Sequence, residues 1–365
     1  VVFVRGALPG ESVEIAIVQS KKDFARGEVV DVVEASASRV VPPCPAYHAG
    51  CGGCTWQHVA PAAQLDLKAA VVTEALRRTG KIMDPDVEVG SSVSPWEYRT
   101  TLRVAVQNGR LGLHRRNSHD VVELRGCPIS HPRLQELLAT IRVRGDGEVS
   151  LRVGASSGER SAWVIDGDVE LVELPADVGV GPAAVVHETV AGRDLQVSAA
   201  SFFQSGPAAA ELLVAAVRQA CADMADTDTV VDAYGGVGLF AATIPANRVI
   251  LVEGSQAACA DATVNLADCR AMVVHAQVEQ WKTRRADLVI ADPSRTGLGR
   301  QAVAVLADTR APRIVLVSCD PVALARDAGL LRDRGYDHVT STVHDLFPQT
   351  HHVEVVTTFQ RRPQH

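Results

Sequence analysis

The sequence contains few aromatic residues, no excess of positive charge and no long hydrophobic run. Aromatic residues make up 4% of its 365 positions, and the formal net charge is −7. No overall basic field therefore attracts a polyanion, and a nucleic-acid surface has to be local. Every apolar run is shorter than the roughly 20 residues of a membrane span, and Val1 to Arg5 lacks the basic region and apolar core of a secretory signal. We expect a cytoplasmic protein with no membrane segment.

The other bulk properties are those of an ordinary globular chain. Hydrophobic residues make up 47% and charged residues 22%, which suits two or three domains with ample core. Because the chain starts at Val1 without Met and inside a strand-like pattern, we expect its true beginning to be missing. Eight cysteines in a cytoplasmic protein indicate metal binding or catalysis rather than disulfides. We expect a monomer.

Residues 1–42 predict a small β domain. Short strand patterns at Val1–Val4, Ser12–Val18 and Gly27–Val33 are separated by turns. This spacing predicts an antiparallel barrel of the OB type, a common nucleic-acid binder, and other small β-barrels are the alternative. The segment V-F-V-R-G-A-L-P-G-E resembles a TRAM domain, an RNA-binding barrel.

A cysteine-rich run follows the boundary at Pro42-Pro43. Cys44, Cys51 and Cys54 form a C-x6-C-x2-C pattern, and Cys127, in a Cys-Pro pair, is the best candidate for a fourth ligand. Zinc also accepts four thiolates, but usually from two close pairs. Because this run has one close pair, the pattern favours a [4Fe–4S] cluster, with zinc as the alternative.

Residues 43–194 predict an antiparallel-rich middle domain. Helical patterns cover Trp56–Thr79 and Pro132–Ile141, and strand patterns occur at Tyr98–Gln107, Arg110–Arg115, Val121–Leu124, Val149–Val153, Ala162–Asp166 and Ala184–Thr189. Residues 91–145 contain nine arginines and four acidic residues, a net charge of +5. This stretch indicates a surface for structured RNA, and a solvated sheet face is the alternative.

Residues 195–365 alternate buried strands with helices, the pattern of an α/β fold with a mostly parallel sheet. The strand Thr229–Ala233 runs into the glycine turn Tyr234-Gly235-Gly236, which brings backbone N–H groups to a nucleoside ligand. Glu253 ends the next strand and suits ribose hydroxyls. Phe203 and Gln204, just before an alanine-rich helix, could stack on and hydrogen-bond a planar ligand, although core packing and capping are alternatives.

Two further strands end in polar residues. Asp292 follows the apolar run before Pro293, and Cys319 follows the run Ile314–Val317, so both lie at the carboxyl edge of the sheet. A cysteine there is a nucleophile only if a neighbour lowers its pKa. Glu354 lies between two valines near the start of the last strand, where burial predicts a raised pKa suited to a general base; an edge glutamate facing water is the alternative.

Five motifs together resemble the RNA uracil-5-methyltransferases, in the branch with a TRAM domain and a [4Fe–4S] cluster. They are the cysteine run, F-F-Q-S, D-P-S-R-T-G, S-C-D-P-V-A-L-A-R-D and F-P-Q-T-H-H-V-E, and they occur in the family's order. The resemblance implies a class I methyltransferase domain, Rossmann-like, that binds S-adenosylmethionine. It implies that Cys319 is the nucleophile and Glu354 the base, that Phe203 stacks on the base, that the cluster ligands are Cys44, Cys51, Cys54 and Cys127, and that the cofactor contacts are Gln204, Tyr234, Gly236, Glu253, Gln277 and Asp292.

The glycine turn departs from the family's usual C-G-x-G-N-F, with Gly235 replacing the cysteine and Leu239 the asparagine. Loss of the asparagine removes a polar contact to the cofactor, and the chemistry does not depend on it. The predicted reaction is methylation of carbon 5 of a uridine in structured RNA, ribosomal or transfer, through a covalent cysteine adduct. The alternatives are a cytosine-5 methyltransferase and a non-catalytic RNA-binding iron–sulfur protein.

Overall fold

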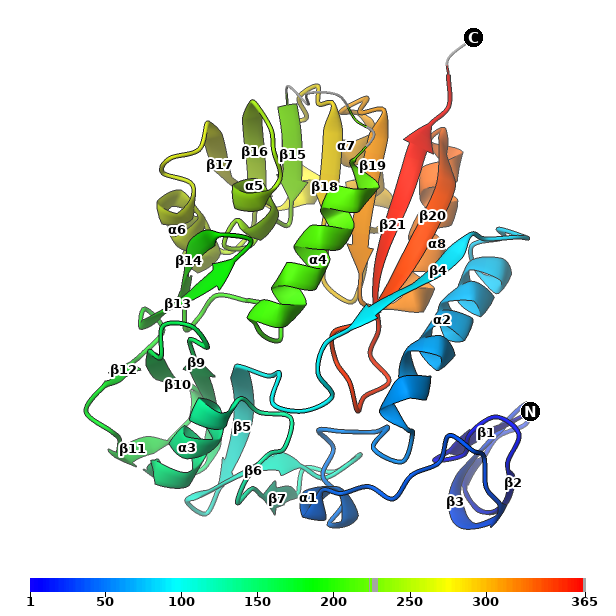
Figure 1. Ribbon diagram of the computed structural model, residues 1–365, viewed down its shortest axis with the longest axis vertical. Helices are drawn as coiled ribbons and strands as arrows, with labels where there is room; N and C mark the ends of the chain where they lie inside the picture. The colour runs from blue at the N-terminus through cyan, green and yellow to red at the C-terminus, as the bar shows by residue number, and fades with distance from the viewer. Residues whose placement is uncertain (223, 225–228, 364–365) are drawn as a thin grey trace.

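The N-terminal strands form a small sheet at one end of the molecule. The computed structural model describes residues 1–222, 224 and 229–363 (Figure 1). The sheet has the order β1 (Val2–Arg5), β3 (Ala25–Glu34) and β2 (Ser12–Ser20). β2 is antiparallel to β3, but β1 is parallel to it. Our antiparallel prediction is therefore wrong for β1: β3 lies between the other strands, and β1 reaches it without a hairpin.

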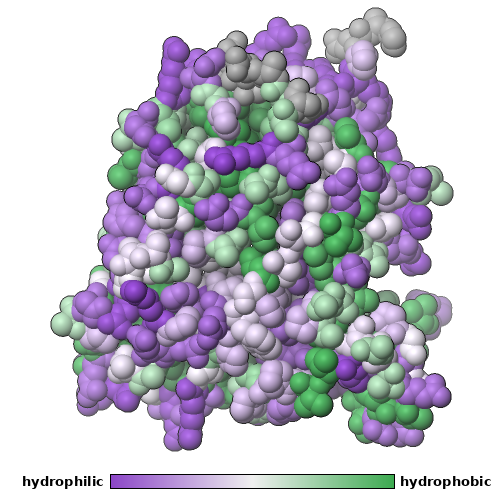
Figure 2. All heavy atoms as spheres, in the orientation of Figure 1, coloured by the Kyte–Doolittle hydropathy of each residue, from purple (hydrophilic) through white to green (hydrophobic). Residues whose placement is uncertain are grey.

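Apolar side chains remain exposed on this small sheet. They gather at the lower right of Figure 2 and include Phe3, Ile17, Val18 and Val30, each more than half exposed. With three strands in the described residues, the sheet lacks a second layer to bury them.

The middle of the chain forms an antiparallel-rich sheet. Its order is β12 (Val178–Val180), β10 (Arg160–Gly167), β9 (Gly147–Val153), β5 (Thr101–Gln107), β6 (Arg110–His114) and β7 (Val121–Glu123), with β12 parallel to β10. The predicted short helix is confirmed as α3 (Pro132–Thr140). Small strand pairs stand beside the sheet, β8 (Arg142–Arg144) with β11 (Glu170–Glu173), and β13 (Val185–Val190) with β14 (Arg193–Ser198).

The C-terminal half of the chain contributes seven strands to an eight-stranded sheet, which confirms the predicted α/β fold. Its order is β17 (Ala271–His275), β16 (Arg248–Glu253), β15 (Thr229–Ala233), β18 (Leu288–Ala291), β19 (Arg313–Ser318), β21 (Glu354–Arg361), β20 (Tyr336–Asp345) and β4 (Val87–Ser92). β21 is antiparallel to both neighbours, and the other pairs are parallel.

Alternating residues of the strands bury both faces of this sheet. In β19, Val315 and Val317 face the core shared with α4 (Pro207–Ala220), and Ile314 and Leu316 face the core on the other side. That second core is formed by α2 (Pro61–Arg78), α7 (Gly299–Ala307) and α8 (Pro321–Asp333). In Figure 1, α4 crosses in front of the sheet. The shorter α5 (Leu239–Thr243) and α6 (Gln256–Asn265) pack near β14–β17.

The sheet crosses the segment boundary that we drew at residue 195. β4 and α2 come from residues 61–92, yet β4 pairs with β20 and α2 packs on β20 and α8. The predicted helix Trp56–Thr79 begins at Pro61, since proline suits the first helical turn. The division into residues 1–42, 43–194 and 195–365 stays a prediction about chain segments.

Candidate active site

Cys319 and Glu354 lie side by side at the carboxyl edge of the sheet. β19 pairs with β21 so that Ser318 is opposite Val355, which puts Cys319 opposite Glu354 one step further along. By the alternation of the strands, both side chains point to the α4 face, as Val317 and Val356 do. Asp292 points to the same face by the same rule, because it follows Ile290 by two residues. The structure thus brings together three groups that are up to 62 positions apart in the sequence.

The turn after β19 is fixed by its own sequence. Pro321 starts α8, and the carboxylate of Asp320 caps the helix by accepting hydrogen bonds from Val322 N at 3.0 Å and Ala323 N at 2.8 Å. Cys319 therefore stands between the last residue of a buried strand and a capped helix. It is partly exposed, so a ligand can reach it.

The surroundings of Cys319 raise the pKa of its thiol to about 12. Burial is the main cause, and the nearby carboxyls of Glu354 and Asp292 add to it, while Arg295 lowers the pKa. A nucleophilic role for Cys319 requires a neighbour that lowers this pKa. Arg295, which our residue assignments missed, is that neighbour, and its position in D-P-S-R-T-G was the signal.

Glu354 is buried, with 4% of its surface exposed. Burial raises the pKa of Glu354 well above its usual value, and Asp292 raises it further. The predicted raised pKa is confirmed, and the alternative of an edge glutamate facing water is wrong. At rest this carboxyl holds a proton more readily than an exposed glutamate does.

Asp292 connects the reaction centre to the segment before α4. Gln204 Nε2 donates to Asp292 Oδ2 at 3.3 Å, and burial raises the pKa of Asp292 to about 7. Two buried carboxyls beside one thiol disfavour further negative charge, so this edge suits a cationic ligand.

The predicted nucleoside contacts lie at the ends of β15 and β16. Glu253 accepts hydrogen bonds from the backbone N–H of Gly236 at 2.9 Å and of Ser255 at 2.7 Å. Gly236 has φ +54 and open space where a side chain would stand, so a ligand can approach its backbone. Gln277 is exposed and lies against Gly254. Tyr234 also takes a left-handed conformation, with φ +59, and its hydroxyl donates to Glu279 at 2.8 Å.

A buried aspartate in β15, two residues before Tyr234 of the same turn, was not among our assignments. Asp232 Oδ2 accepts from Ala241 N at 2.9 Å, while Asp232 Oδ1 has no hydrogen-bond partner in the described structure. Burial raises the pKa of Asp232 to about 7. An acid ending a buried strand just before a glycine turn was the available signal, and its orphaned oxygen fits a polar ligand at this turn.

The two phenylalanines before Gln204 have opposite exposures. Phe203 is 9% exposed and packs in the core, whereas Phe202 is 70% exposed. The stacking role of Phe203 stays a prediction, and Phe202 is the more exposed of the two rings.

The four candidate cluster ligands converge around one small cavity. Cys44, Cys51, Cys54 and Cys127 are each 7–8% exposed and line it with Leu113 and Ile129, among others. Burial, with the other cysteines nearby, raises the pKa of Cys54 to about 12. The glycines between Cys51 and Cys54 permit this packing: a Cβ on Gly52 would meet His114 O at 2.8 Å.

Comparison with known proteins agrees with this geometry. The TRAM domain family matches residues 1–30. An uncharacterized RNA methyltransferase of Streptomyces avermitilis is 35% identical, covering 99% of this chain and 93% of the relative. The 23S rRNA (uracil(1939)-C(5))-methyltransferase RlmD of Methylococcus capsulatus is 33% identical, covering 99% of this chain and 92% of that protein.

This chain belongs to the RNA uracil-5-methyltransferase family.

The structure of this methyltransferase is also similar to a solved one. The Pyrococcus abyssi tRNA (uracil-54, C5)-methyltransferase, in complex with S-adenosyl-L-homocysteine, superposes with a TM-score of 0.74 at 23% identity, covering 98% of this chain and 95% of that one. This likeness shows the fold, which is that of a class I S-adenosylmethionine-dependent methyltransferase with an N-terminal TRAM domain.

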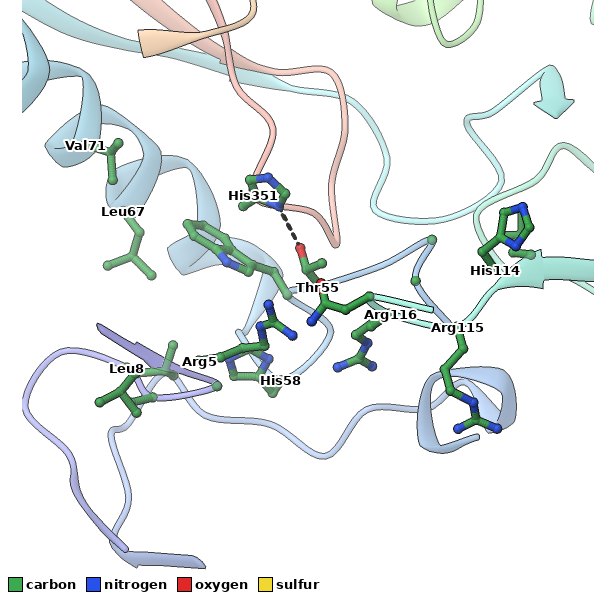
Figure 3. Close-up of a pocket in the computed structure, with 18 of the residues that line it drawn as sticks. Arg5, Leu8, Thr55, His58, Leu67, Val71, His114, Arg115, Arg116 and His351 are labelled. Atoms are coloured by element: carbon green, nitrogen blue, oxygen red, sulfur yellow. Dashed lines mark hydrogen bonds between the residues drawn. The ribbon is translucent and has the colours of Figure 1, made fainter. Parts of the chain in front are cut away.

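The methyltransferase has an open groove beside the cysteine-rich segment (Figure 3). Its volume is about 1520 Å³, and its walls come from the N-terminal sheet, α2, the segment 52–58 and the β6–β7 turn. Arg5, Arg115 and Arg116 reach it, as does His351 from the loop before Glu354. None of the described helices is long and apolar enough to cross a membrane.

Proposed function

We propose that this enzyme transfers a methyl group from S-adenosylmethionine to carbon 5 of a uridine in structured RNA, ribosomal or transfer. The observation that carries the proposal is the placement of Cys319 opposite Glu354 at the carboxyl edge of the sheet. The relatives named above, which include a uracil-C5 methyltransferase, support the same reaction.

The two residues have complementary roles. Carbon 5 of uracil is too weak a nucleophile to take a methyl group unaided. The Cys319 thiolate adds to carbon 6, which places electron density on carbon 5, and carbon 5 takes the methyl group. The bond between the methyl group and the sulfonium sulfur breaks, its electron pair stays on sulfur, and S-adenosylhomocysteine is the leaving group. Glu354 then removes the carbon-5 proton, the electron pair of that C–H bond forms the C5–C6 double bond, and the Cys319–C6 bond breaks. The base must leave any stack to reach this edge.

We assign cofactor binding to the residues around the β15 turn and the Gln204–Asp292 pair. Bound S-adenosylmethionine supplies an electrophilic methyl group on a cationic sulfur. Glu253 suits the ribose hydroxyls, and Gly236, Tyr234 and Gln277 border the same turn. The buried carboxyl of Asp292 and its Gln204 partner suit the positively charged end of the ligand.

We propose that Cys44, Cys51, Cys54 and Cys127 hold a [4Fe–4S] cluster. Their buried thiols around one cavity fit the group. Among the described side chains no three lie where they could hold a single metal ion, and zinc is the alternative occupant of these four thiols. When bound, the cluster orders this loop-rich segment and takes no part in turnover. Iron and sulfide analysis of anaerobically purified protein, with Cys127→Ser as comparison, tests the assignment.

The RNA would lie along the groove of Figure 3 and the arginine-rich middle domain. Arginines there contact the phosphate backbone and the fold of the RNA rather than its sequence. We also propose that the enzyme works as a cytoplasmic monomer, since no disulfide joins the described cysteines and Cys319 and Glu354 lie opposite each other within one chain.

The deciding experiment offers matched RNAs that carry uridine or cytidine at the target, with labelled S-adenosylmethionine. Label in 5-methyluridine supports the proposal. Label in 5-methylcytidine would indicate a cytosine-5 methyltransferase, and RNA binding without label a non-catalytic iron–sulfur protein. Mass mapping of RNA from a deletion strain identifies the nucleotide that loses its methyl group.

A further inference from the structure

The loop that precedes Glu354 is held by contacts from distant parts of the chain. It runs over residues 346–353 between β20 and β21, and its polar residues Gln349 and Thr350 are almost fully buried. Gln349 has φ +68, a left-handed conformation that glutamine rarely adopts. A backbone in this conformation persists only where its surroundings impose it.

Helix α2 provides two of these contacts. Gln64 and Lys68, one turn apart, are the polar residues on its buried face, with 0% and 1% of their surfaces exposed. Gln64 forms a paired contact with Gln349: its Oε1 accepts from Gln349 N at 2.7 Å, and its Nε2 donates to Gln349 Oε1 at 3.2 Å. Gln64 Nε2 also donates to Val59 O at 2.9 Å.

Lys68 holds the start of the same loop. Its Nζ lies 2.6 Å from Asp345 Oδ1 and donates to Phe347 O at 3.3 Å. Asp345 Oδ1 also accepts from Phe347 N at 3.0 Å. Because both charges are buried, removing the lysine would leave an uncompensated carboxylate.

Other segments support the loop as well. The backbone N–H groups of Thr55 and Trp56, just after Cys54, both donate to Gln349 O, at 3.0 and 2.9 Å. Tyr98 and Ser205 donate from their hydroxyls to loop carbonyls, at 3.1 and 2.8 Å. The loop is thus hydrogen-bonded to α2, to the cysteine-rich segment and to the residues just before α4.

We propose that Gln64 and Lys68 are positioning residues, which hold the loop 346–353 in the conformation that directs Glu354 toward the substrate bound at Cys319. This inference rests on the proposed function. Neither residue contacts Cys319 or Glu354 in any described hydrogen bond, so both act through the loop. A general base needs its geometry fixed to within about 0.5 Å, and Glu354 is the first residue of β21, so the loop 346–353 joins the strand directly at this residue.

The inference predicts which step depends on α2. Addition of Cys319 and methyl transfer do not use Glu354. Proton removal from carbon 5, with release of the thiolate, does. Loosening the loop therefore slows release and leaves the earlier steps intact, so the covalent RNA–protein adduct accumulates.

The test compares Gln64→Leu and Lys68→Met with wild type, Glu354→Gln and Asp66→Asn. Asp66 is exposed on the same helix and serves as the matched control. The probe is the RNA that accepts label in the assay above, made once with uridine and once with 5-fluorouridine. Fluorine at carbon 5 cannot be removed by a base, so the fluorinated RNA reports only addition and methyl transfer. Denaturing gels measure adduct, and single-turnover kinetics measure release.

We expect Gln64→Leu and Lys68→Met to form the fluorinated adduct within about twofold of the wild-type rate. With ordinary RNA they should release product at least about tenfold more slowly and accumulate adduct as Glu354→Gln does, since a displacement of about 1 Å can cost about a hundredfold in rate. Lys68→Arg, which keeps the charge, should restore release, and Asp66→Asn should match wild type.

Equal slowing of both adduct formation and release would overturn the inference, because the two residues would then only support the fold. Unchanged release would overturn it as well. A different result would count against the proposed function itself. If fluorinated RNA traps the wild-type enzyme but Glu354→Gln accumulates no adduct with ordinary RNA, Glu354 is not the base. Calorimetry of S-adenosylmethionine binding identifies the variants that fold. If Lys68→Met does not fold, the result for Gln64→Leu alone tests the inference.

Discussion

Arg295 is the charged neighbour that favours the reactive form of Cys319. Two carboxyls and burial raise the pKa of the thiol to about 12, and Arg295 acts against them. The thiolate is the nucleophile, so the rate of addition follows the small ionised fraction. The positive charge of bound S-adenosylmethionine would also lower the pKa of the Cys319 thiol, as Arg295 does.

The raised pKa values of Cys319 and Glu354 predict how the rates of adduct formation and release depend on pH. Below its pKa the thiolate fraction rises about tenfold per pH unit, so adduct formation with 5-fluorouridine RNA should accelerate between pH 6 and 9. Glu354 must be ionised to accept a proton, and its pKa is also raised, so release too is lost as pH falls. Arg295→Ala should slow adduct formation about tenfold at a given pH. A flat profile from pH 6 to 9 would contradict this account.

Cys319→Ala should abolish methyl transfer, because it removes the thiol that lies opposite Glu354 on β19 and that adds to carbon 6 in the proposed route. Cofactor binding should persist, since its assigned contacts lie on β15, β16 and the Gln204–Asp292 pair. Filter assays for methyl transfer and calorimetry for the cofactor measure the two effects. Normal turnover by the variant would rule out the covalent route.

Substitutions of Phe202 and Phe203 test which of the two rings contacts the RNA base. Phe202→Ala should raise the KM for RNA and lower the rate of adduct formation, with little change in the unfolding midpoint, because its ring is 70% exposed. Phe203→Ala should instead destabilise the protein by about 3–5 kcal/mol through the cavity it leaves. The reverse pattern would support the predicted stacking role of Phe203.

At the scale of single elements, the turn at Gly52 shows how tightly the cysteine-rich segment is packed. A methyl group on Gly52 would lie 2.8 Å from His114 O, a backbone atom that cannot swing away. We expect Gly52→Ala to destabilise the protein by about 1–3 kcal/mol and to lower its iron content. Gly329→Ala, in α8 with open space around it, is the matched control and should be neutral or slightly stabilising. Urea unfolding and iron analysis measure both.

Elements with strong local signals could be predicted from the sequence. The buried strands that end at Ala233, Glu253, Ala291 and Ser318 follow from continuous apolar runs, and their shared edge follows from parallel pairing. The contact between Cys319 and Glu354 needs the antiparallel register of β21, which no local pattern encodes. In the sequence Gln64 and Lys68 look like ordinary polar helix residues. Their partners are 277–285 positions away, so no local pattern reveals the contacts.

At the scale of the whole molecule, the catalytic sheet depends on the first quarter of the chain. α2 covers one face beside α8, and β4 pairs with β20 at the edge. A fragment of residues 195–365 would expose this edge and the apolar side chains beneath α2. Such surfaces associate with other chains.

We therefore expect the fragment 195–365 to aggregate, and size-exclusion chromatography measures this directly. Removal of residues 1–34 should leave a monomer, because the N-terminal sheet contributes no strand to the catalytic sheet. A monomeric 195–365 fragment with the unfolding midpoint of the full chain would contradict the expectation.

The pairing of β4 with β20 also sets an order of events during synthesis. Glu88 and Thr342, joined across these strands at 3.3 Å, are 254 positions apart. β4 leaves the ribosome long before its partner exists, and at about 5–20 residues per second the wait lasts tens of seconds. Throughout this interval the nascent chain carries a strand without its partner and the helix that will cover it, so the methyl-transfer centre can assemble only after β20 and β21 have been made.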